Sequence, residues 1–170
     1  DTLSLHDALP ISRAGTAGKG FSVVKEGIID VAWFSSFAYV NAHEKIGIEP
    51  LVSPRVNGKV SYYGYIITRK DSGISSLSGL RGCSFAYVDE GSASGYLDAQ
   101  HIIKSEGMNP KTVFSKTSYL GSHDSVIKAV LSREYDAGAT YNEAMEGAEK
   151  SGIRARAGRI SRPIKRASLL

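Results

Sequence analysis

Apolar residues recur along the chain in two patterns, one that indicates helices and one that indicates strands. Apolar residues three and four positions apart predict helices, and short continuous apolar runs predict buried strands. The predicted helices are 21–28, 37–46, 95–106, 123–134 and 142–150, with a helical turn at 75–80. The predicted strands are 29–34, 51–56, 61–68, 84–88, 112–115 and 136–140.

From residue 84 onward the predicted strands and helices alternate. This order predicts an α/β fold with a mostly parallel sheet and helices on its faces. Ligands of such sheets bind beyond the carboxyl ends of the strands. Three polar segments lie at or near those ends: 91–94, 121–124 and 140–142. We therefore expect the topology to bring these segments together.

The segment 91–95, Gly-Ser-Ala-Ser-Gly, joins a predicted strand to a predicted helix. Backbone N–H groups at a helix start, together with the helix dipole, attract anions. Ser92 and Ser94 add two uncharged hydroxyl donors. This chemistry suits a tetrahedral oxyanion that must be held and later released. Simple capping of the helix by these serines is the alternative.

His123 begins another predicted helix, where it could face solvent or donate to a bound anion. Ser94 and His123 also have the residue types of a hydrolase nucleophile and base, with Asp124 or Asp136 as a third member. The nucleophile-elbow pattern is broken, however, because Ala93 occupies its central position. The four histidines lack metal-ligand spacing, so we expect neither a metal nor another cofactor.

The chain has 170 residues, of which 42% are hydrophobic, and a formal net charge of +4. The charge is uneven, because residues 1–12 hold two acids and residues 153–170 hold six basic side chains and no acid. The segment between them is neutral. A basic tail can bind nucleic acid or anionic lipid, but this one lacks interleaved aromatic residues, which favours a solvated tail. Cys83 is the single cysteine, and we expect it to be a small buried residue.

Residues 1–12 lack the basic start and the continuous apolar run of a signal peptide. They resemble one reading frame of a sequencing adapter oligonucleotide, so we expect them to be foreign. We accordingly expect the chain to be a fragment that lacks its own start and any export signal.

Six short motifs together resemble one protein family. They are 27–34 (GIIDVAWF), 38–40 (AYV), 69–74 (RKDSGI), 91–96 (GSASGY), 121–124 (GSHD) and 136–141 (DAGATY). In this order and spacing, over about residues 19–164, the chain resembles the phosphate-, phosphite- and phosphonate-binding proteins of ABC importers. That family is of the type II periplasmic binding protein class.

The resemblance implies a two-lobed protein that closes on its ligand around a hinge. It implies a partial first lobe at 13–70, a second lobe at 71–158, and a hinge return with the basic tail at 159–170. An incomplete first lobe should expose apolar surface. The implied role is binding without catalysis, in the periplasm or at a lipid-anchored extracellular position, with an ABC permease and ATPase as partners.

The resemblance also implies a set of ligand-binding residues. They are Tyr39, Tyr62, Ser92, Ala93, Ser94, Gly95, His123 and Asn142. The implied cradle uses the hydroxyls of Ser92 and Ser94 and the two backbone amides at positions 93 and 95. The tyrosines and the histidine would donate hydrogen bonds from facing surfaces.

The chain departs from the usual residues of the family at several positions. Ser35-Ser36 replaces Gly-Pro, Ala93 replaces a common threonine, and Gly64 replaces a serine. Asn142 stands where relatives often have an acid that could pair with an amino group. We therefore expect phosphonate, phosphite or phosphate without an amino group as the ligand. A sulfonate-binding protein and a serine hydrolase remain the alternatives.

Overall fold

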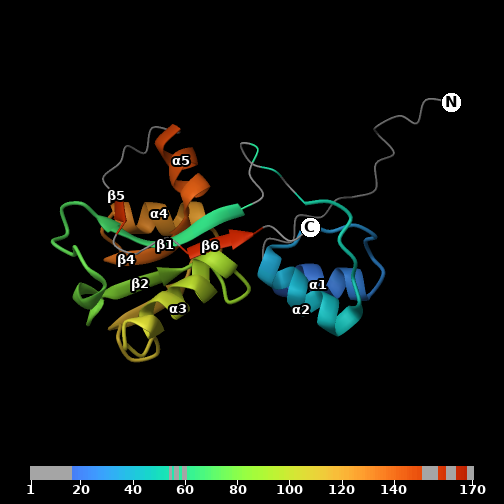
Figure 1. Ribbon diagram of the computed structural model, residues 1–170, viewed down its shortest axis with the longest axis horizontal. Helices are drawn as coiled ribbons and strands as arrows, with labels where there is room; N and C mark the ends of the chain where they lie inside the picture. The colour runs from blue at the N-terminus through green and yellow to red at the C-terminus, as the bar shows by residue number, and fades with distance from the viewer. Residues whose placement is uncertain are drawn as a thin grey trace.

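The computed structural model describes residues 17–53, 55, 58, 61–150, 157–159 and 164–167. The larger part, the sheet unit, is a six-stranded sheet with helices on both faces (Figure 1). The smaller part, segment 17–53, contains two helices that lie together beside the sheet unit (Figure 1). The expected α/β class is confirmed.

The sheet is mixed. Its strands are β1 (Ser61–Arg69), β2 (Ser84–Tyr87), β3 (Lys116–Tyr119), β4 (Ala137–Tyr141), β5 (Ala157–Arg159) and β6 (Ile164–Ala167). They are ordered β3-β2-β4-β1-β5, and β6 also pairs with β1. β2 is parallel to β3 and β4, whereas β1 is antiparallel to β4, β5 and β6. The parallel arrangement predicted from the sequence thus describes β2, β3 and β4 alone.

β1 lies in the range 13–70 that was expected to form the first lobe, but it is a strand of the sheet unit. The sequence groups residues 61–69 with the preceding segment, but five residues of β1, Gly64 to Thr68, pair with β4. Residues 66 and 67 are almost fully buried between the helical layers. Backbone pairing and burial therefore assign this strand to the sheet unit.

Helices cover both faces of the sheet and bury two cores. The helices are α3 (Asp98–Ser105), α4 (His123–Leu131) and α5 (Asn142–Lys150), with short helical turns η2 (Leu77–Leu80) and η3 (Ala93–Leu97). Alternate residues of β2 face opposite layers, because Phe85 packs with α3 and Ala86 packs with α4. In the part of the chain that the structure describes, no helix is long and apolar enough to cross a membrane.

Segment 17–53 contains α1 (Ala17–Lys25) and α2 (Ser36–Ile46). Gly47 ends α2 in the left-handed conformation, with φ of 69°, and its N–H donates to the His43 carbonyl. The predicted strand 29–34 is wrong, because only an isolated bridge forms at Ala32. Residues 51–53 of the other predicted strand also lack regular structure, and positions 54 and 56 lie outside the described residues.

The predicted strand 112–115 is also wrong, because β3 begins only at Lys116. A turn occupies the preceding residues, in which the Asn109 carbonyl accepts hydrogen bonds from the N–H groups of Thr112 and Val113. Val113 is buried in the core on the α3 side. Its apolar character therefore reflects packing of a turn onto the core and not a strand.

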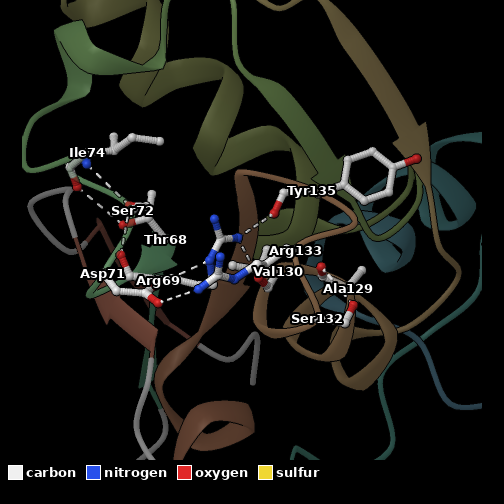
Figure 2. Close-up of polar contacts among 10 residues, drawn as sticks. All are labelled: Thr68, Arg69, Asp71, Ser72, Ile74, Ala129, Val130, Ser132, Arg133 and Tyr135. Atoms are coloured by element: carbon white, nitrogen blue, oxygen red, sulfur yellow. Dashed lines mark hydrogen bonds and ion pairs between the residues drawn. The ribbon is translucent and has the colours of Figure 1, made fainter.

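Arg69, at the end of β1, ties that strand to the end of α4 (Figure 2). Its guanidinium Nη1 donates to the carbonyl oxygens of Val130, at 2.9 Å, and Tyr135, at 3.3 Å. Asp71 lies between this arginine and Arg133, which donates to it at 2.9 Å (Figure 2). The positive charge thus satisfies one carbonyl group in the last turn of α4, where the helix dipole is negative, and a second one in the segment that follows.

Candidate ligand-binding site

A cavity of about 690 Å³ lies between segment 17–53 and the sheet unit. Segment 17–53 contributes most of the apolar wall, including Trp33, Phe34 and Leu51. Ser61, Tyr62, Ser94, Tyr141 and Glu143 line it from the sheet unit. The lining contains no lysine or arginine among the described residues.

The segment that follows β2 was predicted to cradle an anion, and Ser94 is its member that lines the cavity. Ser94 is 5% exposed, and no other described residue forms a hydrogen bond with its hydroxyl. It lies in the first turn of η3, which continues directly into α3. Its hydroxyl is therefore placed at a helix start and is available to a ligand.

Ser92 has the capping role that the sequence left open. Its hydroxyl accepts a hydrogen bond from the Gly95 N–H at 3.0 Å, so this amide is already engaged. Ala93 is buried at the same turn but does not line the cavity. The structure thus separates the predicted cradle into Ser94, which faces the cavity, and neighbours that build the turn.

Gly95 is required by close packing. A Cβ atom at this position would lie 2.4 Å from Val88 Cγ2 and 2.7 Å from Ser92 Oγ. Even alanine would therefore push the helix start away from the end of β2. The glycine positions Ser94 indirectly, since it allows η3 to lie against the strand.

Tyr39 lines the cavity from the first turn of α2. Ser35 caps this helix, since its hydroxyl accepts from the Ala38 N–H at 3.3 Å. Ser35 and Ser36 also line the cavity. Two helix N-termini, that of α2 and that of η3 with α3, therefore border the same space.

Tyr62 and Tyr141 line the cavity from neighbouring antiparallel strands. Their rings meet edge to face, with centroids 5.7 Å apart and an interplanar angle of 71°. Tyr62 was predicted as a ligand-binding residue, whereas Tyr141 was not. Antiparallel pairing of β1 with β4 brings the two together, which the sequence pattern did not reveal.

His123 does not line the cavity but lies behind Tyr141. Its Nδ1 is 3.2 Å from Thr140 Oγ1, and its ring meets the Tyr141 ring with centroids 4.6 Å apart. Burial lowers its pKa to about 4, so the imidazole is neutral at pH 7. In this structure His123 supports a cavity-lining tyrosine.

Asn142 is also engaged elsewhere, since its Oδ1 accepts a hydrogen bond from the Tyr63 N–H at 2.8 Å. The next residue, Glu143, lines the cavity instead. Its Oε2 is buried and has no hydrogen-bond partner among the described residues. Glu143 was not predicted as a lining residue, because the motif indicates position 142 and the side chain of Asn142 is engaged by the β1 backbone.

The structure does not bring Asp136 to His123, although Asp136 was one of the two acids of the hydrolase triad that the sequence left as an alternative. Asp124, the other acid, influences the pKa of His123, but His123 does not line the cavity that Ser94 lines. His123 pairs with Thr140 near the carboxyl end of β4, whereas Asp136 lies before the opposite end of that strand. Both the backbone N–H and the hydroxyl of Ser84 donate to Asp136 Oδ2. Among the described residues no group of three or more His, Cys, Asp or Glu could hold a metal ion.

The fold is that of type II periplasmic binding proteins. A family model described as "ABC transporter, phosphonate, periplasmic substrate-binding protein" matches residues 21–162. The chain belongs to this family.

Three known proteins illustrate the similarity. A probable ABC transporter phosphite-binding protein of Prochlorococcus marinus is 26% identical over 125 residues, 69% of this chain and 42% of its own length. A phosphate-import protein of Mycolicibacterium smegmatis is 29% identical over 126 residues, 68% of this chain and 39% of its own length. The chain thus spans less than half the length of these relatives.

The third is a solved structure with the same fold. It is the binding-protein component of an ABC phosphonate transporter of Pseudomonas aeruginosa, with a TM-score of 0.78 and 21% sequence identity. The superposition covers 91% of this chain and 54% of that one. The agreement in fold confirms the α/β class of type II periplasmic binding proteins that was predicted from the sequence.

Proposed function

We propose that the chain belongs to a solute-binding subunit that captures a phosphonate, phosphite or phosphate and delivers it to an ABC permease. The observation that carries this proposal is the buried Ser94 hydroxyl at a helix start inside the cavity. Tyr39, Tyr62 and Tyr141 border the same space and bear further uncharged hydroxyl groups. Two helix N-termini add partial positive charge. Such a site binds an oxyanion reversibly, without a fixed cation.

The role is binding and not catalysis. His123, the base of the hydrolase alternative, contacts Thr140 and Tyr141 and does not line the cavity that Ser94 lines. The names of the relatives support transport, and membership of the family supports a periplasmic or lipid-anchored extracellular location with a permease and ATPase as partners.

Titration calorimetry with phosphite, methylphosphonate and phosphate tests this function. We expect saturable binding of at least one of the three and a loss of about 10-fold to 100-fold in affinity in Ser94→Ala, because a hydrogen bond to a charged group is lost. Ser105→Ala is the matched control, since Ser105 ends the same helix and donates to the Ile102 carbonyl. Ester hydrolysis that disappears in Ser94→Ala would instead support the hydrolase alternative.

We further infer that Glu143 influences which phosphorus oxyanion binds. A buried carboxylate oxygen without a partner repels a second anion but pairs well with an ammonium group. This favours a phosphonate that carries an amino group, which is opposite to the expectation based on Asn142. The test compares the affinity for 2-aminoethylphosphonate with the affinity for methylphosphonate. Wild type should prefer the amine, and Glu143→Gln should remove that preference; equal preferences in both proteins would contradict the inference.

A further inference from the structure

One hydrogen bond joins segment 17–53 directly to the loop before η3. The Ser35 hydroxyl donates to the Gly91 carbonyl oxygen at 3.2 Å, across 56 positions of sequence. The same hydroxyl accepts from the Ala38 N–H as the cap of α2. Ser35 thus uses its hydroxyl both to cap its own helix and to bind the loop of the sheet unit that precedes η3.

Both partners of this bond are held in place by other contacts. The Ser35 side chain is oriented by its capping bond to α2. On the other side, the Gly91 N–H donates to Asp89 Oδ1 at 2.8 Å, and the Ser92 N–H donates to the Asp89 carbonyl at 3.1 Å. The donor and the acceptor therefore need little reorganisation to meet.

The bond lies at the edge of the cavity. Ser35 lines the cavity, and Gly91 directly precedes Ser92, which caps the turn that carries Ser94. A bond here holds the start of α2 against the turn that faces the ligand. It requires no ligand, because both of its atoms belong to the protein.

We propose that Ser35 is a latch that holds the two sides of the cleft together before a ligand arrives. A two-sided binding protein exists as open and closed forms, and any contact made only in the closed form raises the population of that form. A single solvent-exposed hydrogen bond contributes a modest amount, so it shifts the ratio of closed to open forms by about threefold. The ligand then binds a cleft that is partly closed in advance.

The variant that tests the latch is Ser35→Gly. Glycine removes the donor but is tolerated at a helix N-cap, so α2 should stay folded. Ser35→Thr keeps the hydroxyl and should behave as wild type. Ser122→Gly is the matched control, because Ser122 caps α4 through the Ser125 N–H at 3.1 Å and both of these residues lie within the sheet unit.

Closure is measured without ligand by double electron–electron resonance, which gives the distance between two spin labels. The labels are attached at Glu44 on α2 and Lys104 on α3, which are both exposed. Cys83 is first replaced by serine to leave two labelling sites. We expect a short-distance population in wild type whose ratio to the long-distance population falls about threefold in Ser35→Gly and is unchanged in Ser122→Gly. An unchanged ratio in Ser35→Gly, an equal fall in Ser122→Gly, or a single long distance in wild type would overturn the latch.

A second measurement separates the latch from the proposed function. Methylphosphonate should dissociate about threefold faster from Ser35→Gly than from wild type, since opening is the step that releases ligand. An unchanged dissociation rate would contradict the latch. If no phosphorus oxyanion binds either protein, the proposed function is wrong, while the label distances still decide the latch.

Discussion

The sheet unit and segment 17–53 bury their apolar residues to very different degrees. Ile66, Phe85 and Ile103 in the sheet unit are 0% exposed, whereas Leu51 and Val52 are 75% and 83% exposed. The sheet unit has a core on each face, built from its own strands and helices. Segment 17–53 supplies one wall of the cavity but encloses no comparable core among the described residues. Burial of apolar side chains is therefore distributed unequally between the two parts, while both of them line the cavity.

The largest effect should come from a matched pair of truncations, Phe85→Ala in the sheet unit and Leu51→Ala in segment 17–53. Phe85→Ala should lower the free energy of unfolding by about 3–5 kcal/mol, because it leaves a large cavity in a closed core. Leu51→Ala should change it by less than about 0.5 kcal/mol, since that side chain is largely exposed. Urea unfolding followed by circular dichroism measures both. Similar losses for the two variants would show that the two side chains contribute equally to stability despite their different burial.

Acid should destabilise the sheet unit through His123. Burial gives His123 a folded pKa of about 4, below the ordinary value of 6.5 that it has in the unfolded chain, so the unfolded state binds the proton first. Stability should therefore fall as the pH drops from about 7 toward 4, by on the order of 2 kcal/mol for this partly exposed ring. Unfolding midpoints of wild type and His123→Gln across this range measure the effect. A wild-type pH profile that matches that of His123→Gln would show that His123 does not titrate in this way.

Asp136 should stabilise the folded protein through its hydrogen bonds to Ser84, the first residue of β2. The N–H and hydroxyl of Ser84 lower the pKa of this carboxyl group, so its contribution is present above the unfolded pKa and lost as the pH falls through the folded pKa. Asp136→Asn should cost about 1 kcal/mol at pH 7, a modest figure because the carboxylate is partly solvated. The cost should shrink in strong acid. Glu134→Gln, which changes an exposed acid nearby, is the control and should have little effect at either pH.

The smallest global effect should come from Gly47→Ala. Gly47 has φ of 69°, so alanine should destabilise the end of α2 by about 1 kcal/mol. Hydrogen exchange should become faster in α2, while the urea midpoint of the sheet unit stays the same. A large shift of that midpoint would show that segment 17–53 and the sheet unit unfold together.

Local signals in the sequence predicted most elements of the sheet unit. Apolar spacing predicted helices at α2 and α4, and the polar Ser122 and flexible Gly47 beside them are the cap of α4 and the end of α2 in the structure. Turn and cap chemistry depends on a few neighbouring residues, so sequence alone can reveal it. The strand at 112–115 was wrong because a buried turn carries the same apolar residues as a strand.

The candidate site was predicted less completely than the fold. Tyr39, Tyr62 and Ser94 line the cavity, while Ser92, Ala93, Gly95, His123 and Asn142 lie outside its lining. A motif places residues in the correct turn, but it does not show which side chain points inward. Glu143 and Tyr141 were overlooked as lining residues for this reason.

The sequence by itself determined the alternation of strands and helices in the sheet unit, the starts of α4 and α5, and the turn that carries Ser94, because these follow from neighbouring residues. Only the tertiary structure decided that β1 runs antiparallel into the sheet and that Ser35 meets Gly91. It also decided that Glu143 and not Asn142 faces the cavity. These outcomes depend on contacts between residues far apart in the chain, which local spacing cannot specify.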